Sequence, residues 1–240
     1  LCALQHFHRQ LYGQLRGSWA AVRTWRMAEP GELRAPVPLV VLWGLVALAL
    51  GSGSVELAAA LSLCYHCLLR PGELCRMCRE HLMLPGDPGW TSVVGMVVIC
   101  NPKTARTSGR VQHVVIHDAS VITLCSLTWK WHRPGRQLID FDLGGLERWF
   151  RAALTVLGIP ATRFTPAGLR AGGATHDYLE GSSVERLLFR GRWDSMSTLK
   201  HYVQESAAAL HEGRLPAQTL YVLRVLGERL HQVMCALTLS

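Results

Sequence analysis

The sequence of residues 165–176 is TPAGLRAGGATH, in which one arginine stands among small and apolar residues. Threonine followed by proline is typical of a helix start, because Thr165 caps free N–H groups and Pro166 is tolerated in the first turn. The small residues after Arg170 allow another element to pack closely against this helix. An arginine in such a place needs a partner for its charge. We therefore expect a helix that runs through Tyr178 and holds Arg170 at a special position.

Outward from this stretch, the chain alternates helical patterns with one β-type region. Helical patterns cover residues 1–28, 39–50, 55–69, a segment that starts near Pro71, 120–127, 143–157, 184–189 and 195–210. Residues 90–100 and 111–117 are rich in Val, Ile and Thr and flank a basic segment with Pro, Gly and Ser, which predicts a β-hairpin. The predicted fold class is α+β, mainly helical, with a small antiparallel sheet.

Composition narrows the class of protein. A chain of 240 residues with 49% hydrophobic and 18% charged residues buries a substantial core, which excludes disorder as the main state. The net charge of +8 favours an anionic partner such as nucleic acid. Eight cysteines without a secretory pattern indicate free thiols in a reducing compartment. The longest apolar run, 35–50, falls short of the roughly 20 residues that cross a bilayer, so we expect a buried helix and no membrane partner.

Four segments far apart in the chain each place one polar residue in apolar surroundings: Arg70, Lys103, Arg170 and Tyr202. Two guanidinium groups bind one phosphodiester, a lysine donates a proton, and a tyrosine attacks phosphorus. Taken singly, each residue also fits an ordinary role, as an ion pair at a helix end, a solvated lysine or a core aromatic. Their joint order and spacing favour a phosphoryl-transfer site that needs no metal.

In that order and spacing, residues 36–205 resemble the catalytic domain of the tyrosine recombinases, which include phage-type integrases and recombinases of eukaryotic mobile elements. The segment LLRPGEL, 68–74, is similar to the first arginine box of that family, and Glu73 occupies the place of its carboxylate. Residues i and i+3 of a helix share a face, so Glu73 is expected to orient Arg70. Lys103 stands where the family keeps the lysine that protonates the leaving 5′ oxygen. Residues 165–176 resemble the second arginine box.

Two positions qualify the resemblance. The family usually has histidine three residues before the second arginine, and Ala167 stands there. Without a replacement for this acid/base group, we expect a rate lower by about 10² to 10⁴. Trp193 lies nine residues before Tyr202, where the family has histidine or tryptophan. Its indole N–H donates to a phosphate oxygen but carries no proton through the cycle.

The resemblance implies a reaction and its partners. Tyr202 would attack the scissile phosphate of double-stranded DNA, form a 3′-phosphotyrosyl link and release a 5′-hydroxyl, with no cofactor and no metal. Nearby cations would favour its phenolate. The family also implies a homo-oligomer, a tetramer on DNA, and an intracellular, DNA-associated protein, nuclear if the source is eukaryotic. Further contacts to DNA phosphates are expected from Arg106, Arg110, Arg192 and Lys200.

Three regions follow from the pattern of the chain. Residues 1–34 are expected to be the C-terminal remnant of a helical, core-binding-like N-terminal domain with its linker, and 35–210 the catalytic domain. Residues 211–240 are expected to form a C-terminal helical tail. Its leucines stand at roughly helical spacing. Two roles are open for them: the tail packs on a partner subunit with which it is exchanged, or it packs into the core of its own chain.

Other interpretations stay open beside this one. Ala167 also fits a catalytically impaired DNA-binding relic of a mobile-element recombinase. A topoisomerase that swivels strands is a further, related class. A zinc-binding helical interaction module is suggested by the four cysteines of two CxxC pairs with two nearby histidines, although cysteines at i and i+3 are commonly small core residues. These residues are Cys64, Cys67, Cys75, Cys78, His66 and His81.

Overall fold

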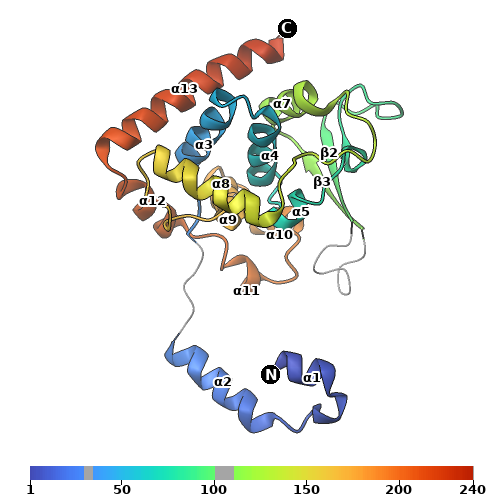
Figure 1. Ribbon diagram of the computed structural model, residues 1–240, viewed down its shortest axis with the longest axis vertical. Helices are drawn as coiled ribbons and strands as arrows, with labels where there is room; N and C mark the ends of the chain where they lie inside the picture. The colour runs from blue at the N-terminus through green and yellow to red at the C-terminus, as the bar shows by residue number, and fades with distance from the viewer. Residues whose placement is uncertain (30–34, 101–110, 240) are drawn as a thin grey trace. The chain divides into compact units, whose positions relative to one another are not determined.

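The computed structural model describes residues 1–29, 35–100 and 111–239 (Figure 1). Contacts divide the chain into two compact units, Leu1–Leu33 and Arg34–Ser240. The first unit is helical as expected, although it is interrupted rather than continuous. Its elements are α1 (Cys2–Phe7), the 3-10 helix η1 (Arg9–Leu11) and α2 (Arg16–Ala28).

The core of the second unit is built on two apolar helices, α3 (Leu39–Gly51) and α4 (Val55–His66). Side chains are buried around nearly the whole circumference of α4, and a helix that is apolar on all sides is stable only when other elements surround it. Helices α3, α7 and α9 pack against α4. Helix α4 therefore lies at the centre of the second unit (Figure 1), and the loop after His66 begins at its C-terminal end.

The predicted hairpin is confirmed in a three-stranded antiparallel sheet of order β1-β2-β3. Its strands are β1 (Leu82–Met83), β2 (Gly95–Cys100) and β3 (Val111–Ile116). Val97 pairs with Val114, and alternate residues of both long strands are buried, so one face of the sheet covers the core. The sequence did not indicate β1, because two residues are too few to show an alternating pattern.

Helix α4 ends at His66, earlier than the predicted Leu69. At this end, carbonyl groups accept hydrogen bonds from side chains of a distant segment and not from further helical N–H groups. Arg190 donates to the His66 carbonyl at 2.6 Å, and Arg192 donates to the Leu68 carbonyl at 3.0 Å. Leu68 has a φ of 50°, in the left-handed region. The chain therefore turns out of α4 and directly into the short helix α5 (Pro71–Leu74).

The middle of the second unit contains α7 (Ala119–Trp129), α8 (Leu143–Val156) and α9 (Ala167–Leu179). Asp118 caps α7 by accepting from the Val121 N–H at 2.9 Å. The predicted Thr165 cap of α9 is wrong. Pro166 is the N-cap residue, with helical φ and ψ of −53° and −30°, and no side chain caps the helix.

Small residues let α9 approach its neighbours closely. A Cβ atom at Gly172 would collide with the Val37 carbonyl oxygen, and one at Gly173 with the Tyr65 carbonyl oxygen. The second contact lies on α4, so the two glycines set the distance between α9 and α4. This agrees with the packing role expected for the small residues after Arg170.

The predicted single helix over 195–210 is wrong. The structure has α10 (Val184–Gly191), then α11 (Met196–Leu199) and α12 (Glu205–Gly213), and Tyr202 lies in the connection between the last two. The Thr175 hydroxyl accepts from the Gln204 N–H at 3.1 Å, and it shares its proton between the Ala171 carbonyl at 2.9 Å and the Tyr202 carbonyl at 3.1 Å. Tertiary hydrogen bonds from α9 thus replace helical ones at this point.

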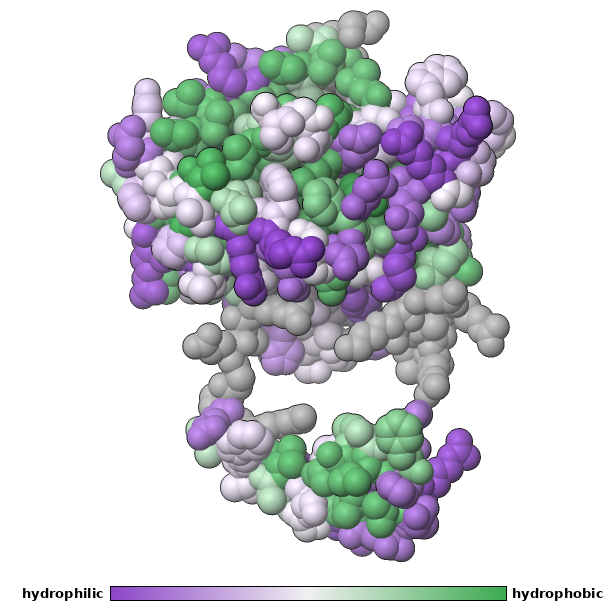
Figure 2. Space-filling model, in the orientation of Figure 1, coloured by the Kyte–Doolittle hydropathy of each residue, from purple (hydrophilic) through white to green (hydrophobic). Residues whose placement is uncertain are grey.

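The last helix, α13 (Ala217–Leu239), packs against α3 and α7. Leu223 and Met234 are buried in the main core, which is the second of the two roles considered for the tail. Other apolar side chains of α13, such as Val233, stay exposed. Figure 2 shows hydrophobic surface over the part of the second unit where α13 lies. In the described part of the chain, no helix is both long and apolar enough to span a membrane.

Candidate active site

Arg70 and Glu73 form a local pair at the start of α5. Arg70 is the N-cap residue, and its backbone N–H donates to Glu73 Oε2 at 2.9 Å. Arg70 Nη1 donates to Glu73 Oε1 at 2.7 Å. The Glu73 side chain is only 3% exposed. The hydrogen bond expected between these two residues is therefore present, and it fixes the direction of the Arg70 guanidinium.

Arg192 reaches the same carboxylate from a distant part of the chain. Its Nη2 donates to Glu73 Oε2 at 3.0 Å and to the Leu68 carbonyl at 3.0 Å. Arg192 directly follows α10, and its backbone has φ 58° and ψ 47°. This left-handed conformation is unusual for a residue other than glycine. The sequence predicts a DNA contact for Arg192 and gives no sign that it lies beside Glu73. Its position directly before Trp193 indicates a place near the predicted site but not this contact.

Arg170 is buried on α9, with 2% of its surface exposed. Its Nη2 donates to the Gly191 carbonyl. Its guanidinium carbon lies 4.8 Å from the centre of the Trp193 ring and 5.3 Å from that of Tyr202. Within the described ranges, Arg170 Nε and Nη1 have no hydrogen-bond partner. The buried cation thus packs against two aromatic rings and leaves donors unpaired.

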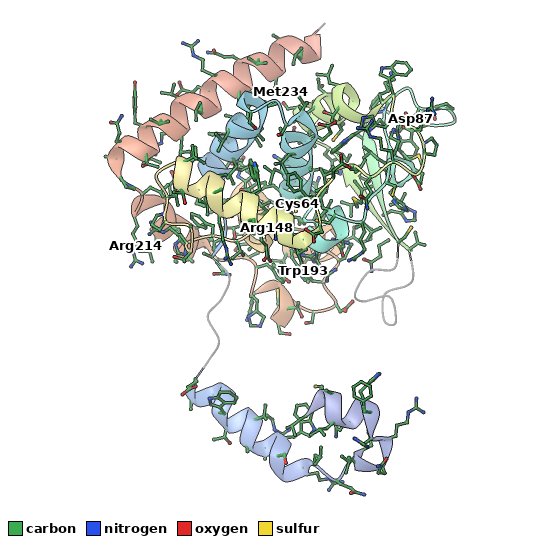
Figure 3. The ribbon with its side chains drawn as sticks, viewed as in Figure 1. Cys64, Asp87, Arg148, Trp193, Arg214 and Met234 are labelled. Atoms are coloured by element: carbon green, nitrogen blue, oxygen red, sulfur yellow. The ribbon has the colours of Figure 1, made fainter. Side chains whose placement is uncertain are left out.

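Tyr202 is half-buried, with its ring centre 4.8 Å from that of Trp193. Trp193, labelled in Figure 3, lies just after α10, and its Nε1 is buried without a partner among the residues described. Thr175 of α9 holds the Tyr202 carbonyl, so the helix that carries Arg170 also positions the tyrosine backbone. Arg170, Trp193 and Tyr202 therefore contact one another. The other set, Arg70, Glu73 and Arg192, is linked to them through Arg192, which directly precedes Trp193.

The cluster carries more positive than negative charge. Two arginines, Arg70 and Arg192, bind the Glu73 carboxylate, and Arg170 carries a third positive charge. Burial lowers the pKa of Arg170, and the charges of Arg192 and Arg70 lower it further. Burial also lowers the pKa of Arg192, against the opposing effect of Glu73. Because arginine keeps its charge in proteins, the arrangement is suited to an anion that supplies the missing negative charge.

The pKa of Glu73 leads to a prediction about acid stability. Burial raises this pKa, but the Arg192 charge and the hydrogen bonds from Arg70 and Arg192 outweigh burial and hold it below its usual value. Ionised Glu73 therefore stabilises the fold above about pH 4.3, and this contribution is lost as the pH falls through the lowered pKa. We expect Glu73→Gln to lower the free energy of unfolding at pH 7 by about 1–3 kcal/mol.

Urea unfolding between pH 3 and pH 7 measures this effect. The difference between wild type and Glu73→Gln should shrink towards pH 3. The matched control is Glu147→Gln, which removes an exposed carboxylate from α8. Equal pH profiles for the two variants would contradict the role assigned to Glu73.

Other predicted site residues lie outside this cluster or outside the described part of the chain. Lys103, Arg106 and Arg110 belong to 101–110, which is not among the described residues. Lys200 is exposed at the end of α11. Ala167 begins α9, as its place in the sequence indicates.

The structure does not bring the two CxxC pairs together as a zinc site. Over 1–29, 35–100 and 111–239, no three His, Cys, Asp or Glu side chains form a group able to hold a metal ion. All four thiols are free, and Cys64 Sγ donates to the Leu69 carbonyl at 3.3 Å inside the core (Figure 3). Burial raises the pKa of Cys64, and it raises the pKa of Cys67 to about 12. These thiols behave as small core residues.

Helices with a small three-stranded antiparallel sheet give this chain a tyrosine recombinase-like fold. The chain is similar to the crystal structure of XerA recombinase, with a TM-score of 0.56 and 18% sequence identity over 78% of this chain and 68% of that chain. No protein-family model and no curated protein matches it. At this level of identity the comparison establishes the fold, and any chemistry has to be argued from the residues of the site.

Proposed function

We propose that this protein cleaves and rejoins DNA strands through a 3′-phosphotyrosyl intermediate, as a recombinase or integrase of a mobile element. The observation that carries the proposal is the position of Arg170. Its buried guanidinium packs on Tyr202 and Trp193 with donors unpaired, beside two further arginines. The unpaired donors are suited to bind the oxygens of a phosphodiester, and the phenol beside them is suited to attack its phosphorus.

The proposed reaction conserves the energy of the ester bond. The Tyr202 hydroxyl loses its proton to water, and its oxygen forms a bond to phosphorus while the bond from phosphorus to the 5′ oxygen breaks. Lys103 donates a proton to that leaving oxygen. Arg70 and Arg170 hold the non-bridging oxygens, and the Trp193 N–H adds one hydrogen bond. The reverse attack by a 5′-hydroxyl restores the DNA strand, on the same or another duplex.

Double-stranded DNA is the partner that this chemistry requires, and the net charge of +8 favours it. Arg106, Arg110 and Lys200 are proposed to contact its backbone. A tetramer on DNA is proposed from the family resemblance. Ala167 provides no base for the phenol proton, so we expect slow turnover, and a DNA-binding relic is the competing function.

Trapping with nicked DNA separates the two functions. A library of random-sequence duplexes, each with a nick beside a fixed position, loses a short fragment on cleavage and so prevents religation. We expect a protein–DNA adduct that survives denaturing detergent, with a free 5′-hydroxyl on the released fragment. Duplex binding without any adduct would contradict the enzyme and favour the relic.

A further inference from the structure

The geometry points to Arg192 as a third guanidinium that binds the reacting phosphate, with Glu73 as its positioning residue. This inference rests on the proposed function and deepens it. Arg192 then has a more specific role than a contact to the DNA backbone. It belongs to the same phosphate site as Arg70 and Arg170.

The first argument is the hydrogen bonding of a buried charge. The Arg192 side chain is 5% exposed, and its protein partners, Leu68 and Glu73, both bind Nη2. Its Nε and Nη1 find no partner among the described residues. Buried donors of a charged group are costly to leave unpaired, so a native site keeps them where a ligand supplies acceptors.

The second argument is charge. Arg170 has the same pattern, with Nη2 bound to the Gly191 carbonyl and Nε and Nη1 unpaired in the part of the chain that is described. Arg170 donates to the Gly191 carbonyl, directly before Arg192 in the chain, and the charges of Arg192 and Arg70 both act on Arg170. Glu73 balances one of the three positive charges. A phosphodiester placed among them supplies a further negative charge and four oxygen acceptors.

The third argument is the backbone. Gly191 accepts from Arg170 and is followed by Arg192 in the left-handed conformation, which is unfavourable for a residue other than glycine. This conformation ends α10 and allows the Arg192 side chain to reach Glu73 on α5. One short segment, directly before Trp193, thus binds Arg170 through the Gly191 carbonyl and supplies Arg192.

This assignment limits what Arg192 does. A guanidinium stays protonated, so Arg192 stabilises negative charge on phosphorus but does not replace the histidine absent at Ala167 as an acid/base group. We therefore expect a site that binds phosphate well and removes the phenol proton slowly. A purely structural Arg192 would only bind Glu73 and the Leu68 carbonyl, and the ammonium group of a lysine has donors for both.

Binding of inorganic phosphate to the full chain, measured by calorimetry at low ionic strength, tests the inference. Arg192→Lys keeps a charge beside Glu73 but loses the Nε and Nη1 donors. We expect its dissociation constant for phosphate to rise about tenfold or more. The matched control, Arg186→Lys, changes an exposed arginine of α10 and should leave binding unchanged. Wild-type affinity in Arg192→Lys would overturn the inference, as would a wild-type protein that does not bind phosphate.

A measurement on the wild type covers the case in which Arg192→Lys does not fold. In an assigned ¹H–¹⁵N spectrum, added phosphate should shift the Nε–H signals of Arg192 and Arg170. The Arg79 Nε–H already donates to the Trp129 carbonyl at 2.8 Å and should not shift. A shift at Arg170 alone would overturn the inference while leaving the proposed function intact. Shifts at both residues without any covalent DNA adduct would support the inference and contradict the proposed enzyme.

Discussion

Tyr202→Phe should abolish the covalent adduct with nicked DNA, a loss of at least about 10⁴-fold in the rate of adduct formation. The substitution removes only the phenol oxygen, which is the proposed nucleophile. The ring that packs at 4.8 Å from Trp193 and at 5.3 Å from the Arg170 guanidinium carbon remains. We therefore expect thermal stability and affinity for duplex DNA close to those of the wild type.

Adduct formation on denaturing gels measures this effect, with Tyr221→Phe as the matched control. Tyr221 lies on α13 and is 65% exposed, so loss of its hydroxyl should leave the adduct yield unchanged. An adduct that persists in Tyr202→Phe would remove Tyr202 from the chemistry. Equal losses in both variants would do the same.

Arg170→Lys should slow adduct formation by about 10²- to 10³-fold. Lysine keeps the positive charge but offers a single ammonium group where arginine presents a planar set of donors that packs on Trp193 and Tyr202. The reaction needs these donors most when charge accumulates on the pentacoordinate phosphate. We therefore expect a larger effect on the cleavage rate than on DNA affinity.

Single-turnover kinetics with saturating nicked duplex separates the rate from the affinity. Arg186→Lys is again the control, because it makes the same chemical change on the exposed side of α10. A thermal melt of each variant shows whether the fold is intact, since Arg170 also donates to the Gly191 carbonyl. A folded Arg170→Lys protein that cleaves at the wild-type rate would contradict the role of Arg170.

The sequence predicted the fold where a pattern is local and regular. The apolar runs predicted α3 and α4, and two runs rich in Val, Ile and Thr around a segment with Pro, Gly and Ser predicted the β2–β3 hairpin, as observed. The helix expected over 195–210 failed because no Gly or Pro marks its interruption at Tyr202. The interruption depends on Thr175, 27 residues away, which hydrogen-bonds the Tyr202 backbone.

In the candidate site, too, the sequence predicted the contact between residues close in the chain and not the contact between distant segments. The bond from Arg70 to Glu73 follows from their i, i+3 spacing, and the structure contains it. The approach of Arg192 to Glu73 does not, because it depends on a left-handed residue and on contacts between segments 119 residues apart. The spacing of the cysteines left a zinc-binding module open beside the interpretation as core residues, and only tertiary packing shows that Cys64 and Cys67 are buried in the core.

The central claim is that groups distant in the chain meet around one phosphate with Tyr202 as the attacking residue. Mass spectrometry of the trapped adduct, after digestion of the DNA by nuclease and of the protein by protease, tests it most directly. The account predicts a nucleotide attached to the peptide that contains Tyr202. A nucleotide on any of the other four tyrosines, or on a residue of another type, would contradict it.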